Sequence, residues 1–264
     1  QENVINFEEL LISFERVPPA MQALAPRIDS GDADDFQGSV NNHNGKLLLT
    51  WLETAFGRPA FDEFLFRYFE DFAFRTITSE HFLDYLDDRL LSRSGSDVSR
   101  AAAQEWLYEP GLPKGVPVPT STTLDQAAML ARVWSSGEID TADVETSGWC
   151  PQALIHFINN LAEDIPQDRL AVLDSALGLS APTNAEIGRT WFIQVAKRRY
   201  EPAYVPLAAY LERHGRIRLI APVYRALAEN GEDLGLASEI FDAARGRYHP
   251  LAVGAISRSL RAPG

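Results

Sequence analysis

The sequence predicts an all-α protein built from two parts. Nearly every segment with a regular apolar pattern has the three- and four-residue spacing of a helix, and strand-like alternation is nowhere sustained. With 264 residues, of which 45% are hydrophobic and 10% aromatic, the chain can bury a large core. One Pro- and Gly-rich stretch, EPGLPKGVPVPTST at 109–122, interrupts the helical pattern and predicts a stiff linker. We therefore expect domains at 1–110 and 122–264, joined by a linker at 111–121.

Five helices are expected before the linker. The first ends at Pro18-Pro19, because proline blocks helix continuation. The second covers 47–56 and ends at Gly57-Arg58-Pro59. An aromatic stripe in the third predicts core packing; its members are Phe61, Phe64, Leu65, Tyr68, Phe69 and Phe72. Thr78-Ser79-Glu80 opens a fourth helix, and a fifth ends at Trp106-Leu107-Tyr108.

Eight amphipathic segments follow the linker, each punctuated by Gly, Pro, Asn or Asp. They lie near 123–136, 151–163, 167–178, 184–199, 202–214, 217–229, 233–245 and 250–260. Consecutive helices with short connections are typical of an α-solenoid, although the sequence shows no strict repeat period. We expect an armadillo- or HEAT-like arrangement here.

Charge and composition exclude several kinds of protein. A net charge of −13 argues against a nucleic-acid partner, because phosphate recognition depends on a basic surface. No apolar run approaches the length of a membrane span, and we expect a soluble protein of the cytoplasm or periplasm. The single cysteine rules out an intrachain disulfide. The five scattered histidines form no His-Glu-x-x-His motif, so we expect no metal site from this chain alone.

Two groups of polar residues are candidates for binding. The stretch at 41–44 (Asn-Asn-His-Asn) precedes an apolar run, and it reads either as a surface turn or as one wall of a polar site. Arg216 and Arg218 lie near the start of an expected helix, where anions are favoured, and they would point the same way in an extended segment. Ordinary surface salt bridges are an equally good explanation of these arginines.

Several fragments together resemble the C-terminal part of leukotriene A4 hydrolase and its bacterial aminopeptidase relatives. They are FGRPAFDEFLFRYFEDFAFRTITSEHFLDYL, WLYEPGLP, NAEIGRTW, HGRIR and YHPLA, in the same order as in that family. The resemblance implies a gluzincin-type zinc aminopeptidase, with later helices of a thermolysin-like catalytic domain followed by a C-terminal α-solenoid. The zinc ligands would lie before Gln1 or be absent, so zinc is expected only if an upstream half exists.

The resemblance also assigns roles to site residues. An ungapped match through Gly45 places Asn42 at the position of the family's catalytic tyrosine, which stabilises the oxyanion, and His43 at the next position. Arg216 and Arg218 match the family's Arg-x-Lys pair for a substrate carboxylate. Asp34 and Gln37 match further polar positions of the cleft. These residues predict a peptide or small carboxylate-bearing substrate, with no catalytic residue assigned with certainty.

Three functions remain open at this point. The first is the C-terminal region of a metallo-aminopeptidase, which shapes the substrate cleft and has a zinc-containing N-terminal half as its partner. The second is a metal-free pseudo-enzyme that serves as a binding scaffold, suggested by Asn42 and the missing zinc motif. The third is a repurposed enzyme that uses the Asn41–Asn44 wall for a reaction other than peptide hydrolysis.

Overall fold

The computed structural model describes residues 1–26, 39–93, 98–113, 116, 118–229 and 231–261. Thirteen α-helices, several short 3₁₀ turns and one π-helical turn make up the secondary structure of these ranges, and none of the residues in them forms a strand. The predicted all-α class is therefore confirmed. The chain divides into two compact units, Gln1–Thr120 and Ser121–Gly264, and the division falls at the end of the predicted linker.

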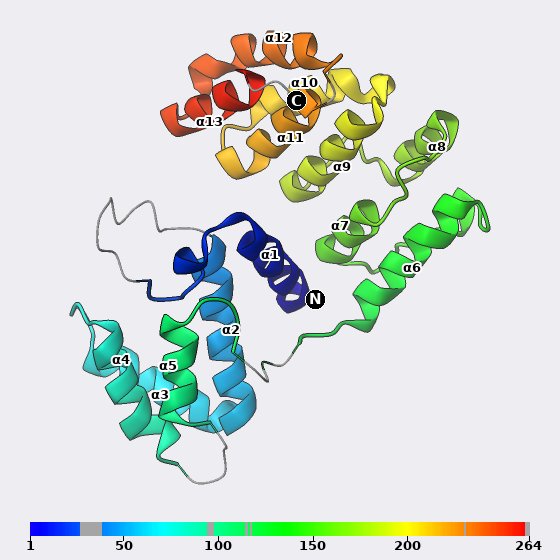
Figure 1. Cartoon of the computed structure of the whole chain (residues 1–264). Helices are drawn as coiled ribbons and strands as arrows, with labels where there is room; N and C mark the ends of the chain where they lie inside the picture. The colour runs from blue at the N-terminus through cyan, green and yellow to red at the C-terminus, as the bar shows by residue number, and fades with distance from the viewer. Residues whose placement is uncertain (27–38, 94–97, 114–115, 117, 230, 262–264) are drawn as a thin grey trace. The chain divides into compact units, whose positions relative to one another are not determined.

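The first unit contains five α-helices (Figure 1). They are α1 (Glu2–Arg16), α2 (Ser39–Phe56), α3 (Arg58–Asp71), α4 (Ser79–Leu86), which runs on into the π-helical turn η3 (Asp87–Leu91), and α5 (Arg100–Tyr108). Their ends follow the sequence signals. Gly57 takes a positive φ of 77° between α2 and α3, and the side chains of Thr78 and Ser99 accept the backbone N–H groups of His81 and Ala102 as N-caps.

The start of α2 differs from the prediction, which placed it at Leu47. The helix begins eight residues earlier, at Ser39. Val40, Asn44 and Leu48 are all buried, at the spacing of one helical face. Asn44 is 0% exposed, and its Oδ1 accepts a hydrogen bond from Nε1 of Trp106 at 2.6 Å. The polar stretch therefore continues the helix, because an asparagine occupies a core position and is paired there.

Leucines and aromatic residues from α1 to α5 form one core in this unit. Trp106 is fully buried in it, and the partly buried Trp51 packs against Trp106 with ring centroids 4.8 Å apart. Phe61 and Phe64 of the aromatic stripe are buried in it as predicted. Phe69, which was expected to be a core residue, is 68% exposed, because it lies on the outer side of α3.

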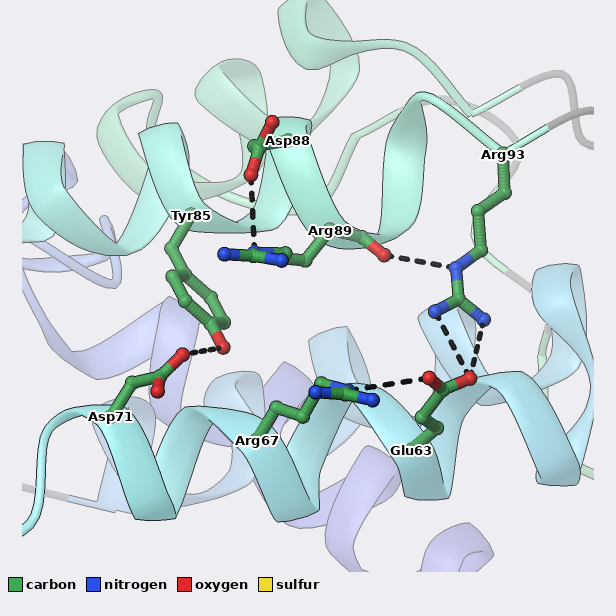
Figure 2. A network of polar contacts seen from close by, with 7 residues as sticks. All are labelled: Glu63, Arg67, Asp71, Tyr85, Asp88, Arg89 and Arg93. Atoms are coloured by element: carbon green, nitrogen blue, oxygen red, sulfur yellow. Dashed lines mark hydrogen bonds and ion pairs between the residues drawn. The ribbon is translucent and has the colours of Figure 1, made fainter.

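Polar contacts join α3 to the stretch formed by α4 and η3 (Figure 2). Both terminal nitrogens of Arg93 donate to Oε2 of Glu63 at 3.1 Å, and these hydrogen bonds hold the pKa of Glu63 below its usual value. Tyr85 donates to Asp71 at 2.7 Å. Partial burial and this hydrogen bond raise the pKa of Tyr85 to about 12. The network ties α4 and Arg93, which follows the π-helical turn, to α3 at the surface of the unit.

The second unit contains eight α-helices, at the places where eight helical segments were predicted. They are α6 (Thr122–Ser136), α7 (Pro151–Asn159), α8 (Gln167–Leu177), α9 (Ala185–Arg198), α10 (Tyr204–Arg213), α11 (Ile217–Glu229), α12 (Leu234–Ala244) and α13 (Pro250–Arg261). Gly137 and Gly178 end α6 and α8 in the left-handed conformation. The side chain of Asn184 caps α9 by accepting from Glu186 and Ile187.

Alternate helices of the second unit pack on one another. α7 contacts α9, α9 contacts α11, and α11 contacts α13, while α10 packs against α12 (Figure 1). Gly188 allows the close approach of α9 to α10: a Cβ atom there would lie 2.9 Å from Pro182 and from the ring of Tyr210. Large buried side chains such as Trp191, Phe192 and Tyr224 fill the core between these helices. No helix in the described ranges is both long and apolar enough to cross a membrane.

Candidate functional site

The predicted site residues fall into three groups. Asn42 and His43 lie on α2 in the first unit, and Arg216 and Arg218 lie at the start of α11 in the second. Asp34 and Gln37 lie outside the described residues. The structure therefore places the two arginines at the start of α11 in one unit, and Asn42 and His43 on α2 in the other unit.

The α2 residues face different environments. Asn42 is exposed. The side chain of His43 is only 18% exposed, and its Nε2 lies 3.5 Å from a carboxylate oxygen of Glu9 on α1. Asn44 is enclosed in the core with Trp106, so it lines no cleft. The expected continuous wall from Asn41 to Asn44 is wrong for Asn44, because a helix turns successive side chains by about 100°.

The arginines of the second unit lie on either side of the first residue of α11. Arg216 is exposed, and its carbonyl oxygen accepts the N–H groups of Leu219 and Ile220, so it is the residue that begins the helix. Arg218 lies within the first turn of α11. The two arginines therefore do not share one extended segment, and the argument that they point the same way for that reason is wrong.

Glu186 is the partner of Arg218. Nη2 of Arg218 donates to Oε1 of Glu186, and the other oxygen of the same carboxylate lies 3.3 Å from Nε of Arg189. The backbone N–H of Glu186 is fixed by the side chain of Asn184 at 2.8 Å. The carboxylate thus holds two arginines from a capped helix start. Sequence reasoning missed Glu186, because nothing in the spacing links it to an arginine 32 positions away.

Arg216 differs from its neighbour. No carboxylate among the described residues forms an ion pair with Arg216, whereas the half-exposed Arg218 is held by Glu186. The first backbone N–H groups of a helix lack intrahelical acceptors, and the helix dipole adds partial positive charge at that end. An exposed guanidinium beside the start of α11 is therefore suited to bind an anion, above all a carboxylate that can accept two parallel hydrogen bonds.

In the part of the chain that the structure describes, no three His, Cys, Asp or Glu residues are grouped so that they could hold a metal ion. These residues therefore offer no donor set that fits the zinc ion of the resembled family.

Comparison with known proteins relates this chain to one group. Residues 149–260 match the family described as leukotriene A4 hydrolase, C-terminal. Leucine aminopeptidase 2 of Yarrowia lipolytica is 28% identical over 244 residues, which cover 87% of this chain and 37% of that protein. A leukotriene A-4 hydrolase homolog of Botryotinia fuckeliana is 26% identical over 235 residues, or 87% of this chain and 36% of the relative.

A solved structure of a leukotriene A4 hydrolase is also similar to this chain. The native structure of yeast LTA4 hydrolase matches 99% of this chain with a TM-score of 0.80 and 25% sequence identity, and the match covers 46% of the yeast chain. The chain thus spans less than half the length of the relatives it matches. Residues 149–260 are therefore similar to the leukotriene A4 hydrolase C-terminal family, and most of the chain is similar to leukotriene A4 hydrolase and leucine aminopeptidase 2 proteins.

Proposed function

We propose that this chain is the C-terminal region of a leukotriene A4 hydrolase-like metallo-aminopeptidase. The first unit would supply the later helices of a thermolysin-like catalytic domain, and the second unit would be an α-solenoid. The contacts of α7 with α9, α9 with α11 and α11 with α13 support the solenoid assignment, because these helices pack on the next but one along the chain. The match of the chain to the yeast LTA4 hydrolase structure supports the whole assignment.

The role of the second unit in this proposal is to bind a substrate carboxylate through Arg216. The observation that carries it is the contrast between the two arginines: Arg218 forms an ion pair with Glu186, and Arg216 is exposed with no ion pair among the described residues. The ion pair leaves Arg218 as a positioned second charge rather than a free one. A peptide with a free C-terminus supplies the planar, two-oxygen acceptor that a guanidinium matches best.

Peptide hydrolysis in this proposal requires a zinc-containing half as a partner. In aminopeptidases of this kind the metal activates water and polarises the scissile carbonyl. The resemblance assigns Asn42 to the position of the family tyrosine, and Asn42 is exposed on α2. Its side chain is shorter than that of tyrosine, and the loss of one oxyanion donor typically lowers the rate by about 10²–10³-fold. We therefore expect weak peptidase activity even in the assembled enzyme.

The binding claim is tested with a peptide acid and its amide. Isothermal titration with Ala-Ala-Ala and Ala-Ala-Ala-amide should give tighter binding of the acid, by about 1.5–3 kcal/mol, the usual scale of a charged hydrogen bond. Arg216→Gln should remove this difference. Arg225→Gln is the matched control, because Arg225 is exposed on the same helix and has no ion pair in the described chain. Equal affinity of the wild type for acid and amide would refute carboxylate binding.

A metal-free binding scaffold is the second candidate. The substitution of Asn42 at the tyrosine position favours it, because a scaffold has no need of an oxyanion donor. It predicts peptide binding through Arg216 without any turnover in the protein from its own source. The third function, a reaction run by the Asn41–Asn44 wall, loses one of its residues, because Asn44 is buried against Trp106.

The remaining expectations stay predictions. They include the zinc-containing partner half and the cytoplasmic or periplasmic location. The relatives compared above are fungal, so the expected bacterial type gains no support from them.

A further inference from the structure

A second candidate for ligand binding is a pocket of the second unit, which neither Arg216 nor Arg218 lines. Its volume is about 600 Å³, and it lies between the 180–185 segment, α9 and α10. Three rings form its aromatic wall: Phe192 from α9, Tyr210 from α10, and His214 directly after α10. Pockets of this size are typical of small-molecule sites.

Hydrogen bonds and ring contacts fix the aromatic wall. Tyr210 donates its hydroxyl to the carbonyl oxygen of Ala185 at 2.9 Å. Its ring centroid lies 5.1 Å from that of Phe192 and 4.3 Å from that of His214. Nδ1 of His214 lies 2.9 Å from the carbonyl oxygen of Tyr210. Because a carbonyl only accepts, Nδ1 carries the hydrogen and the imidazole is locked in place.

The 180–185 segment of the pocket lining is equally fixed. The backbone N–H and the hydroxyl of Ser180 both donate to the carboxylate of Asp174, at 2.7 and 2.6 Å. Nε1 of Trp191 donates to the same hydroxyl at 3.1 Å. Ser180 is therefore fully occupied, and it holds the segment that carries Pro182 in position. Because the aromatic residues and the 180–185 segment are already held in place, ligand binding costs little conformational entropy.

The charge of the pocket selects the ligand. Of the described residues that line the pocket, Arg213 is the one with a charged side chain. Its charge is positive, although the net charge of the chain is −13. The neighbouring carboxylates are committed elsewhere: Glu212 lies 3.6 Å from Arg247, and Glu186 binds Arg218 and Arg189. Arg213 itself is exposed and has no ion pair within the described chain. A cation with no acidic neighbour on the pocket lining favours an anionic ligand.

We propose that this pocket binds a small aromatic carboxylate, whose ring packs against Tyr210 and His214 and whose carboxylate pairs with Arg213. This site is separate from the carboxylate site proposed at Arg216. The aromatic wall would supply the apolar area and the ring contacts, and the guanidinium would supply a bidentate charged hydrogen bond.

The proposal is tested by calorimetric titration of the full chain with N-acetyl-phenylalanine and with its carboxamide. The acid should bind at least about tenfold more tightly than the amide, since hydrogen bonds to charged groups are worth that much. Arg213→Gln should abolish this preference, and Arg225→Gln should leave it unchanged. Ala209→Trp should abolish binding of both compounds, because Ala209 lines the pocket at an exposed position where a large side chain fills it without disturbing the core.

Comparison of Arg213→Gln with Arg216→Gln distinguishes binding in this pocket from the carboxylate binding proposed at Arg216. If Arg216→Gln removes the preference for the acid and Arg213→Gln does not, the ligand is bound at the other site; the pocket proposal is then overturned and the proposed function stands. If Arg213→Gln removes it and Arg216→Gln does not, the pocket is supported whatever happens with Ala-Ala-Ala. Binding of neither compound to the wild type would also overturn the proposal.

Discussion

Replacement of Asn44 by alanine is the perturbation that most directly tests how α2 is built. Asn44 is fully buried, and its Oδ1 is 2.6 Å from Nε1 of Trp106. Asn44→Ala leaves the indole N–H without an acceptor, at a cost of about 1–3 kcal/mol, and adds a small cavity worth about 1 kcal/mol. Nδ2 of Asn44 has no acceptor among the described residues, and removal of this buried donor offsets part of the loss. We expect a net destabilisation of about 2–3 kcal/mol.

The assay must report the first unit by itself, because two units can unfold separately. Hydrogen exchange in increasing urea, followed by mass spectrometry of peptides from α2 and α5, meets this need. Asn42→Ala is the matched control: it makes the same change two positions earlier, at an exposed site, and should cost less than about 0.5 kcal/mol.

A double-mutant cycle isolates the hydrogen bond itself. Trp106→Phe removes the donor, so Asn44→Ala should cost about 1 kcal/mol less in that background than in the wild type. If Asn44→Ala proved no more harmful than Asn42→Ala, the reasoning that places Asn44 in the core would be refuted. Additive effects of Asn44→Ala and Trp106→Phe would refute the hydrogen bond alone.

Two further predictions concern packing and pH. Gly188→Ala should destabilise the second unit by about 1–3 kcal/mol in urea unfolding, because the new Cβ atom would lie 2.9 Å from Pro182 and Tyr210. Gly235→Ala in α12 is the control and should not destabilise the unit in this way, because a Cβ atom there has nothing within 4 Å. Equal effects of the two substitutions would contradict the close packing at Gly188. The lowered pKa of Glu63 stabilises the fold at pH values above the usual glutamate range, and this contribution is lost as the pH falls through the lowered pKa. The stability difference between the wild type and Arg93→Gln should therefore shrink on acidification, and NMR titration should show the pKa of Glu63 rising in the variant; an unchanged pKa would contradict the role of Arg93.

Much of the fold could be predicted from local signals. The breaks at Pro18-Pro19 and Gly57 and the N-cap at Thr78 act within one or two turns, so the pattern alone places them. The start of α2 could not be placed in this way. Asn44 reads as a loop residue until its partner Trp106 is known, and that partner lies 62 positions further along the chain.

Only part of the candidate site could be predicted from the sequence. The resemblance singled out Arg216 and Arg218, but the sequence treats them alike. What distinguishes them is Glu186, which binds Arg218 across 32 positions. The pocket also depends on tertiary packing, because Phe192 and Arg213 line it from different helices, α9 and the end of α10. Pairings between distant helices depend on tertiary packing, which residue spacing does not encode.

The most direct test of the central claim is native mass spectrometry of the protein purified from its own source. If this chain is the C-terminal region of an aminopeptidase, the spectrum should show either a chain longer than 264 residues or a complex with a second chain, and that species should carry zinc. A metal-free species of 264 residues without a partner would contradict the aminopeptidase assignment and would favour the binding scaffold.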